Sequence, residues 1–201
     1  MRLSMPRRSL LTLVAIGLVT VLAGAQTWSA FHATSASDDN SFAAGTVVLT
    51  DNDGGTALLS LPGAIPGDSD NACVKVSYAG SLPSELRLHG TTTGDGLDPY
   101  LNLVLTRGTF PGAPPASNSC VGFSADATDY LGSGAGVIYS GTLQAFPDDY
   151  GAGHIDPRPA SPETWTSGES HVYKLQITLQ NDLDARSKTA TQTFTWEARN
   201  T

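Results

Sequence analysis

Apolar and polar residues alternate over short stretches of this chain. Apolar residues recur at alternate positions within residues 72–80, 84–90 and 100–108, and again within 171–180 and 189–198. A period of two is typical of a strand with one buried face. No stretch outside the N-terminal region keeps a helical period over three turns. Short strands at regular spacing, separated by turn residues, predict an all-β protein, a jelly-roll-like antiparallel β-sandwich.

Two other segments are less regular. Residues 44–50 and 56–61 flank the turn-rich stretch 51–55 and predict a β-hairpin. Residues 136–146 predict either a strand or a strand followed by a helical turn. These elements together place the sandwich domain at residues 44–201.

The pattern also predicts where three apolar side chains late in the chain pack in this sandwich. Within 171–180 the pattern predicts Val172 on the core face, with a slip at Lys174 before the next apolar residue. Trp196 lies in an alternating strand and is predicted to be a core residue. Trp165 lies in a loop and is expected to pack over one end of the sandwich; a platform for stacking a carbohydrate is the alternative.

The N-terminal region follows the pattern of an export signal. Arg2, Arg7 and Arg8 precede an uncharged apolar run over residues 10–23. This run of about 14 residues is shorter than the roughly 20 that span a bilayer. Residues 1–30 are therefore predicted to be a cleavable signal peptide, with an uncleaved N-terminal anchor as the alternative. No second apolar run of membrane length follows, so no membrane span is expected after cleavage.

Two cleavage points fit the small residues that a signal peptidase requires. A cut after Ala25 would leave Gln26 as the new N-terminus, and a cut after Ala30 would leave Phe31. The residues alone do not separate the two. Residues 31–43 would then form a flexible N-terminal arm in front of the sandwich.

Charge narrows the range of partners. Removal of residues 1–30 takes away three of the 11 basic residues and none of the 19 acidic ones, which leaves a net charge near −11. Such a surface repels nucleic acid and anionic lipid, so neither is an expected partner. It is compatible with cation binding or simply with solubility.

Cys73 and Cys120 are the only cysteines of the sequence. In an exported chain an even pair predicts a disulfide, and no C-x-x-C spacing suggests a redox or metal role. Closing a loop of about 47 residues would stabilise the fold by roughly 4 kcal/mol through loop-closure entropy. About 170 mature residues can bury an adequate core without this bond, so it is expected to act as a staple.

The sequence carries no catalytic motif. It has no H-E-x-x-H, no G-x-S-x-G and no phosphate-binding loop. The four histidines, His32, His89, His154 and His171, are isolated from one another in sequence. The chain is therefore not expected to be an enzyme, and no catalytic residue, metal site or cofactor is predicted.

Calcium is the one ion that local acidic stretches suggest. Residues 51–55 resemble the start of a calcium loop but lack its later ligands, so a turn is expected there. Asp148, Asp149 and Asp156 could make a looser calcium site with backbone carbonyls, as an alternative to ordinary loop residues.

Stretches in order along the chain resemble one known family. "TWSAF" at 27–31, followed by "NSFAAGTVVL" at 40–49, resembles the N-terminus of the TasA/CalY (camelysin) family of exported Gram-positive proteins. Residues 60–88 resemble the family's Pro-Gly-Asp loop and the strand after it, and residues 173–181 and 193–199 resemble its closing hairpin. The N-terminal motif is the specific part, and the likeness covers most of the mature chain.

The resemblance implies a secreted jelly-roll protein of the extracellular matrix or cell surface. It implies a SipW-type signal peptidase that cuts between Ala30 and Phe31. It also implies assembly with other copies into fibres of the biofilm matrix, where further matrix proteins would be partners. In donor-strand exchange, the N-terminal segment of one subunit pairs with an open sheet edge of the next, and this head-to-tail contact does not close. Phe31 and Phe42 would anchor the donor strand.

Two other functions are alternatives to this matrix role. One is a monomeric secreted binding module for calcium, a glycan or a protein. The other is a camelysin-type metallo-endopeptidase, which no zinc motif in this sequence supports. The chain also departs from its apparent relatives by short Gly-, Pro- and Ser-rich loops in place of long insertions, and by the Cys73/Cys120 pair.

Overall fold

The computed structural model describes residues 32–35, 49–51, 58–113, 118–158 and 162–200. These ranges contain strands and short 3-10 turns but no α-helix, which confirms the predicted all-β class. No helix within them is long and apolar enough to cross a membrane. The predicted signal peptide, residues 1–30, lies outside the described residues. The strands are β1 (His32–Ser35), β2 (Leu49–Thr50), β3 (Ser69–Tyr78), β4 (Ser84–Thr93), β5 (Leu101–Thr109), β6 (Ser124–Ala125), β7 (Val137–Thr142), β8 (His154–Ile155), β9 (Thr164–Trp165), β10 (Ser170–Leu179) and β11 (Thr191–Asn200), and the 3-10 turns are η1 (Asp98–Tyr100), η2 (Leu143–Ala145) and η3 (Leu183–Ala185).

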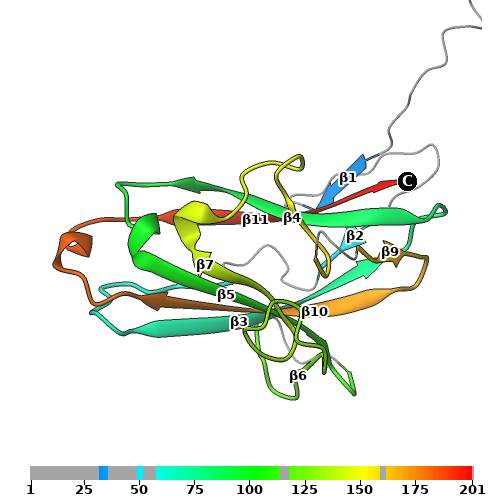
Figure 1. The fold of residues 1–201 in the computed structure, drawn as a ribbon, viewed down its shortest axis with the longest axis horizontal. Coiled ribbons are helices and arrows are strands. Elements are labelled where there is room, and N and C mark those ends of the chain that lie inside the picture. The colour runs from blue at the N-terminus through cyan, green and yellow to red at the C-terminus, as the bar shows by residue number, and fades with distance from the viewer. Residues whose placement is uncertain (1–31, 36–48, 52–57, 114–117, 159–161, 201) are drawn as a thin grey trace, which may run out of the picture. The chain divides into compact units, whose positions relative to one another are not determined.

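The strands form two sheets that lie over one another (Figure 1). The five-stranded sheet has the order β1-β11-β4-β8, and β9 also pairs with β4. The six-stranded sheet has the order β2-β3-β10-β5-β6, and β7 also pairs with β5. The pairings are antiparallel. The chain changes sheet between β3 and β4, between β4 and β5, and between β10 and β11, as in a jelly roll.

The core lies between the two sheets and follows the alternation predicted from the sequence. In β10 and β5, Leu175 lies opposite Leu105 and Ile177 opposite Leu103, and all four are buried. The five-stranded sheet contributes Trp196, which is 3% exposed and confirmed as a core residue. Its ring lies 5.6 Å from the ring of Tyr173 in the other sheet. Alternating apolar positions on both inner faces therefore supply one continuous core.

The start of β10 differs from the prediction. Tyr173 lies in the core row with Leu175, because the register with both neighbouring strands runs without a slip at Lys174. Val172 is also buried, but it points to the other face of β10. A buried tyrosine is accepted here because its hydroxyl donates a hydrogen bond of 3.0 Å to Asp156.

Two predictions about irregular segments have different outcomes. The segment 136–146 forms β7 followed by the 3-10 turn η2, as predicted. The hairpin of 44–50 and 56–61 is wrong where it can be checked: residues 58–61 form no strand, and β2 pairs with β3 instead. Leu58, Leu59 and Leu61 pack against the core from a loop, so their burial does not require strand pairing.

The predicted disulfide between Cys73 and Cys120 is present. The two Cα atoms are 5.0 Å apart, and the bond closes a sequence separation of 47 residues. Next to it, the amide of Cys73 donates a hydrogen bond of 3.2 Å to the carbonyl of Asn118. The bond thus fastens the loop after β5 to strand β3.

Candidate functional site

The structure describes only a part of the predicted N-terminal arm, as strand β1. Ala30, Phe31 and Phe42 lie outside the described residues. Strand β1 directly follows Phe31 and pairs with β11, with Ala33 opposite Ala198. Within the predicted arm 31–43, a segment of four residues is therefore a strand.

Both sheets end in a very short strand on this side. We call it the N-terminal edge: β1 on β11 in one sheet, and β2 on β3 in the other. Strand β1 has four residues, whereas β11 has ten. Residues 191–195 of β11 consequently have no strand partner on this side within the described part of the chain.

The opposite side of the sandwich is covered more completely. We call it the far edge: β8 and β9 on β4, and β6 and β7 on β5. Between the paired stretches of β4, the amide of Asp156 donates to the carbonyl of Leu86, and beyond them the amide of Gly90 donates to the carbonyl of Pro147. Little of the backbone of β4 and β5 is left open there, so the far edge is a poor template for another strand.

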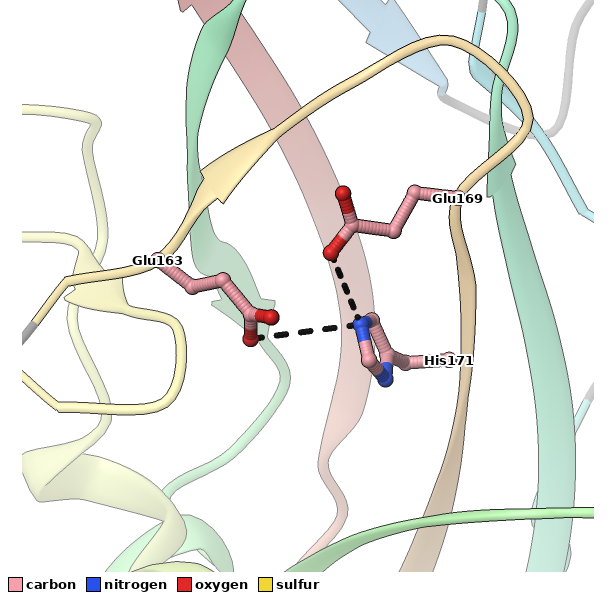
Figure 2. A group of neighbouring side chains, drawn as sticks. All are labelled: Glu163, Glu169 and His171. Carbon is pink, nitrogen blue, oxygen red and sulfur yellow. Dashed lines mark hydrogen bonds and ion pairs between the residues drawn. The ribbon is translucent and has the colours of Figure 1, made fainter.

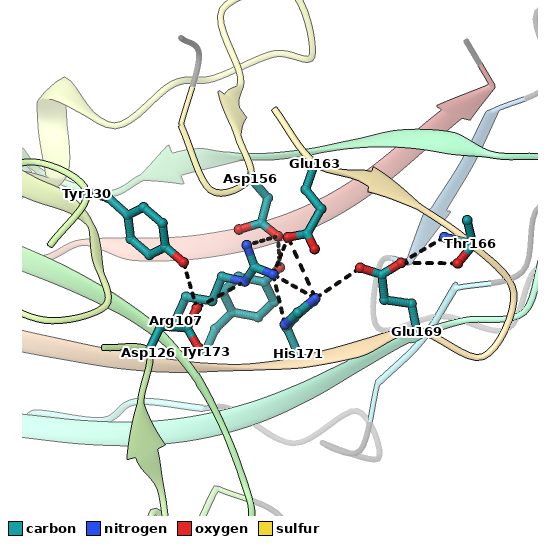
Figure 3. Close-up of polar contacts among 9 residues, drawn as sticks. All are labelled: Arg107, Asp126, Tyr130, Asp156, Glu163, Thr166, Glu169, His171 and Tyr173. Carbon is teal, nitrogen blue, oxygen red and sulfur yellow. Dashed lines mark hydrogen bonds and ion pairs between the residues drawn. The ribbon is translucent and has the colours of Figure 1, made fainter. Parts of the chain in front are cut away.

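A group of polar side chains, some of them buried, lies at the far edge. We call it the polar cluster; its members, drawn in Figure 3, are Arg107, Asp126, Tyr130, Asp156, Glu163, Thr166, Glu169, His171 and Tyr173. Arg107 continues the inward-facing row of leucines in β5 and lies opposite Tyr173 of β10. Arg107 is 3% exposed and Tyr173 is fully buried. A charged residue thus occupies a core position at this end of the sandwich.

Three carboxylates neutralise the guanidinium of Arg107. Its Nε lies 3.5 Å from Asp126 Oδ2, its Nη1 lies 3.6 Å from Asp156 Oδ2, and its Nη2 contacts Glu163 Oε2. Asp126 directly follows β6, Asp156 directly follows β8, and Glu163 directly precedes β9. One buried arginine therefore holds three segments that cover the far edge.

Burial and pairing act against each other on the charges of this cluster. Burial raises the pKa of Asp156 to about 6, although Arg107, His171 and the Tyr173 hydroxyl act in the opposite direction. The second carboxylate oxygen of Asp156, Oδ1, has no hydrogen-bond partner in the described structure. Burial also raises the pKa of Tyr173 well above its ordinary value, and the neighbouring Asp156 adds to this shift. Burial alone would lower the pKa of Arg107, but Asp156 and the other acidic neighbours raise it, so the guanidinium stays charged.

At the outer side of the polar cluster, His171 faces two glutamates (Figure 2). Its Nε2 lies 3.2 Å from Glu169 Oε1 and 3.9 Å from Glu163 Oε2. The other oxygen of Glu169 accepts a hydrogen bond of 2.9 Å from the amide of Thr166. Burial would raise the pKa of Glu169, but this amide and His171 outweigh it, so the pKa is lowered. These three side chains form the one group in the described residues with the composition and spacing of a metal site.

The sequence showed these residues only in part. His171 is isolated from the other histidines, and the two glutamates were not singled out as its partners. Arg107 carried a usable signal, because it falls in phase with the three inward-facing leucines of its strand. Glu169 and His171 carried a weaker one, since residues two apart in an extended segment share a face.

The remaining predictions of binding residues have clear outcomes where the structure describes them. Asp149 accepts a hydrogen bond from the amide of Ala152 within its own turn, and Asp156 pairs with Arg107. Among the described residues, these two and Asp148 do not form a group with the spacing of a metal site. Trp165 is fully buried, which excludes the carbohydrate platform, and it lies in strand β9 instead of the predicted loop. The stretch 51–55 lies largely outside the described residues.

Comparisons with known proteins add no relative. The sequence matches no protein-family model and no curated protein.

Proposed function

We propose that this chain is a secreted structural protein of the extracellular matrix or cell surface that assembles head to tail through its N-terminal strand. The resemblance of residues 27–31 and 40–49 to the TasA/CalY family supports this proposal, with SipW-type processing after Ala30. The observation that carries it is the contrast between β1 and β11 at the N-terminal edge.

The geometry of this edge suits an exchange of strands. The order β1-β11-β4 leaves β11 with one complete partner, β4, and one partner that covers only residues 196–199. A four-residue strand offers few hydrogen bonds to hold it in place. The N-terminal segment of a second copy can pair in the same register and extend along residues 191–195, which gains backbone hydrogen bonds that β1 does not make.

The direction of this contact leads to a filament. The donor segment and the accepting strand are different parts of one chain, so the contact is heterologous. Such contacts continue from copy to copy unless a rotation closes them into a ring. Because each processed chain carries a net charge near −11, assembly should improve with salt or divalent cations.

The test compares the processed chain starting at Phe31 with a chain starting at Gly45, which lacks β1. Both are examined by electron microscopy and by sedimentation over a range of salt concentrations. Filaments from the first chain alone are the expected result. Monomers from both under every condition would overturn the proposal and favour a monomeric binding module.

A further inference from the structure

We propose that Glu163, Glu169 and His171 form a binding site for a divalent transition-metal ion, with Zn²⁺ as the ion that best fits their chemistry. One ligand atom from each side chain lies within 4.8 Å of the other two. Four-coordinate zinc takes ligands at about 2.0–2.2 Å, so its ligand atoms lie roughly 3.3 Å from one another. The separation of 3.2 Å between His171 Nε2 and Glu169 Oε1 has this value already.

Neighbouring side chains hold the imidazole of His171 in place. The fully buried ring of Trp165 meets it edge to face at a centroid distance of 4.8 Å. Nη2 of Arg107 lies 2.7 Å from its Nε2 and 3.0 Å from its Nδ1. Figure 2 shows Nε2 of His171 turned toward the two glutamates.

The two carboxylates are arranged as a fixed ligand and an adjustable one. Glu169 is held through its Oε2 by the Thr166 amide, which leaves its Oε1 toward His171. Such outer contacts orient metal ligands and support their affinity. Glu163 Oε2 is 3.9 Å from Nε2 and contacts Nη2 of Arg107, so it must leave that contact and approach His171 when an ion binds. Its side chain is 39% exposed, so it can make this movement and the ion can enter from solvent.

The charge balance of the polar cluster favours a cation. Four carboxylates, those of Asp126, Asp156, Glu163 and Glu169, make ion pairs within the described structure only with Arg107 and His171. With neutral His171, one guanidinium faces four negative groups. Arg107 repels a nearby metal ion, but its charge is shared among Asp126, Asp156 and Glu163. The cluster therefore keeps negative charge that a divalent ion can balance.

The donor set separates transition metals from calcium and magnesium. An imidazole nitrogen suits zinc and its first-row neighbours, whereas Ca²⁺ and Mg²⁺ prefer oxygen ligands only. Three protein ligands leave a fourth position for water. A bound ion would connect the segment before β9 to the start of β10, and so strengthen the far edge. This inference does not depend on filament assembly.

The experiment is calorimetric titration of the chelator-treated chain Phe31–Thr201 with Zn²⁺, and separately with Ca²⁺ and Mg²⁺. The expected result is one Zn²⁺ per chain, with Ca²⁺ and Mg²⁺ bound at least tenfold more weakly. Glu169→Gln and His171→Gln should each weaken Zn²⁺ binding at least tenfold, since even residues behind the ligands typically account for 10–100-fold. Zn²⁺ should also raise the melting temperature of the parent chain and leave that of both variants unchanged.

His89→Gln is the matched control. His89 also lies 3.2 Å from a glutamate, Glu197, and its side chain is 15% exposed, as is that of His171, but it has one carboxylate partner instead of two. This variant should bind Zn²⁺ like the parent. His32, next to the new N-terminus, is present in all the variants and so cannot cause a difference between them. Equal Zn²⁺ affinity in the parent and both site variants, or no Zn²⁺ binding at millimolar concentration, would overturn the proposal. If His171→Gln does not fold, Glu169→Gln still tests the proposal, because the side-chain amide oxygen of the new glutamine can accept the hydrogen bond from the Thr166 backbone amide.

Discussion

The two edges of the sandwich are closed by different means. At the far edge, β6 to β9 cover β4 and β5, and buried Arg107 holds the adjoining segments through three ion pairs. At the N-terminal edge, strands of four and two residues meet β11 and β3, which have ten residues each. Unpaired backbone groups at a sheet edge attract another strand. The difference teaches that one sandwich can combine an edge covered by several segments with an edge covered only by short strands.

The largest expected effect on stability comes from replacing Arg107, the arginine that holds the segments of the far edge together. We expect Arg107→Met to lower the free energy of unfolding by roughly 3–5 kcal/mol, because it leaves buried Asp156 without its cation. Urea denaturation of the processed chain measures this change. Arg87→Met is the control, since Arg87 pairs with Glu85 at a side-chain exposure of 22% and should account for about 1 kcal/mol. Equal losses in the two variants would show that burial of the pair has no special weight.

At the N-terminal edge, the disulfide of Cys73 in β3 is expected to contribute to the free energy of unfolding. Cys73→Ala combined with Cys120→Ala should lower the free energy of unfolding by roughly 4 kcal/mol, because the unfolded chain loses the constraint on its loop. The reduced parent chain should unfold at the same denaturant concentration as this double variant. A double variant as stable as the oxidised parent would mean that the bond adds no constraint to the unfolded chain.

At the far edge, Asp156 should make the stability of the folded chain depend on pH. Its pKa of about 6 in the folded chain lies above the ordinary value of 3.8. The folded state therefore binds this proton more tightly than the unfolded state, so the contribution is present at low pH and is lost as the pH rises through 6. Between pH 7 and pH 5 the folded state should gain roughly 1 kcal/mol from this group.

Asp156→Asn isolates that contribution. The variant should lose this part of the pH dependence, measured as the difference from the parent chain in denaturation series at the two pH values. Asp126→Asn is the control, because Asp126 also pairs with Arg107 but is 21% exposed. It should keep the dependence of the parent. A parent chain and Asp156→Asn with parallel pH profiles would assign the effect to other groups.

The sequence predicted those parts of the fold that depend on local pattern. The alternation found β3, β4, β5, β10 and β11, since each of these strands has one face on the core. It placed a slip at Lys174 and so left Tyr173 out of the core row, whereas the structure supplies Asp156 as a buried partner for the Tyr173 hydroxyl. The polar cluster could not be predicted in the same way. Its members come from distant segments, and only the register of β5 with β10 and the covering of the far edge bring them together.

Removal of β1 should have the smallest effect on stability. The same removal should have the largest effect on the proposed assembly. Four residues in an edge strand make about one hydrogen bond each, worth roughly 1 kcal/mol apiece, while ordering each residue costs about 1–2 kcal/mol. The two contributions nearly cancel, so a chain that starts at Gly45 should match the Phe31 chain in free energy of unfolding to within about 1 kcal/mol. A loss of several kcal/mol would show that β1 is a fixed part of each subunit and oppose strand exchange.

Cross-linking then shows which chain supplies the strand. Ala33 and Ala198 are opposite one another in the register of β1 and β11, so cysteines at both positions can form a disulfide. In assembled samples this bond should join different chains and give a ladder of covalent multimers on non-reducing gels. At low salt, before assembly, it should form within single chains. Cysteines at Ala33 and Thr193, which are not paired in the folded chain, are the matched control. Bonds confined to single chains in pelleted filaments would mean that the filaments form through another surface and that the N-terminal edge stays closed.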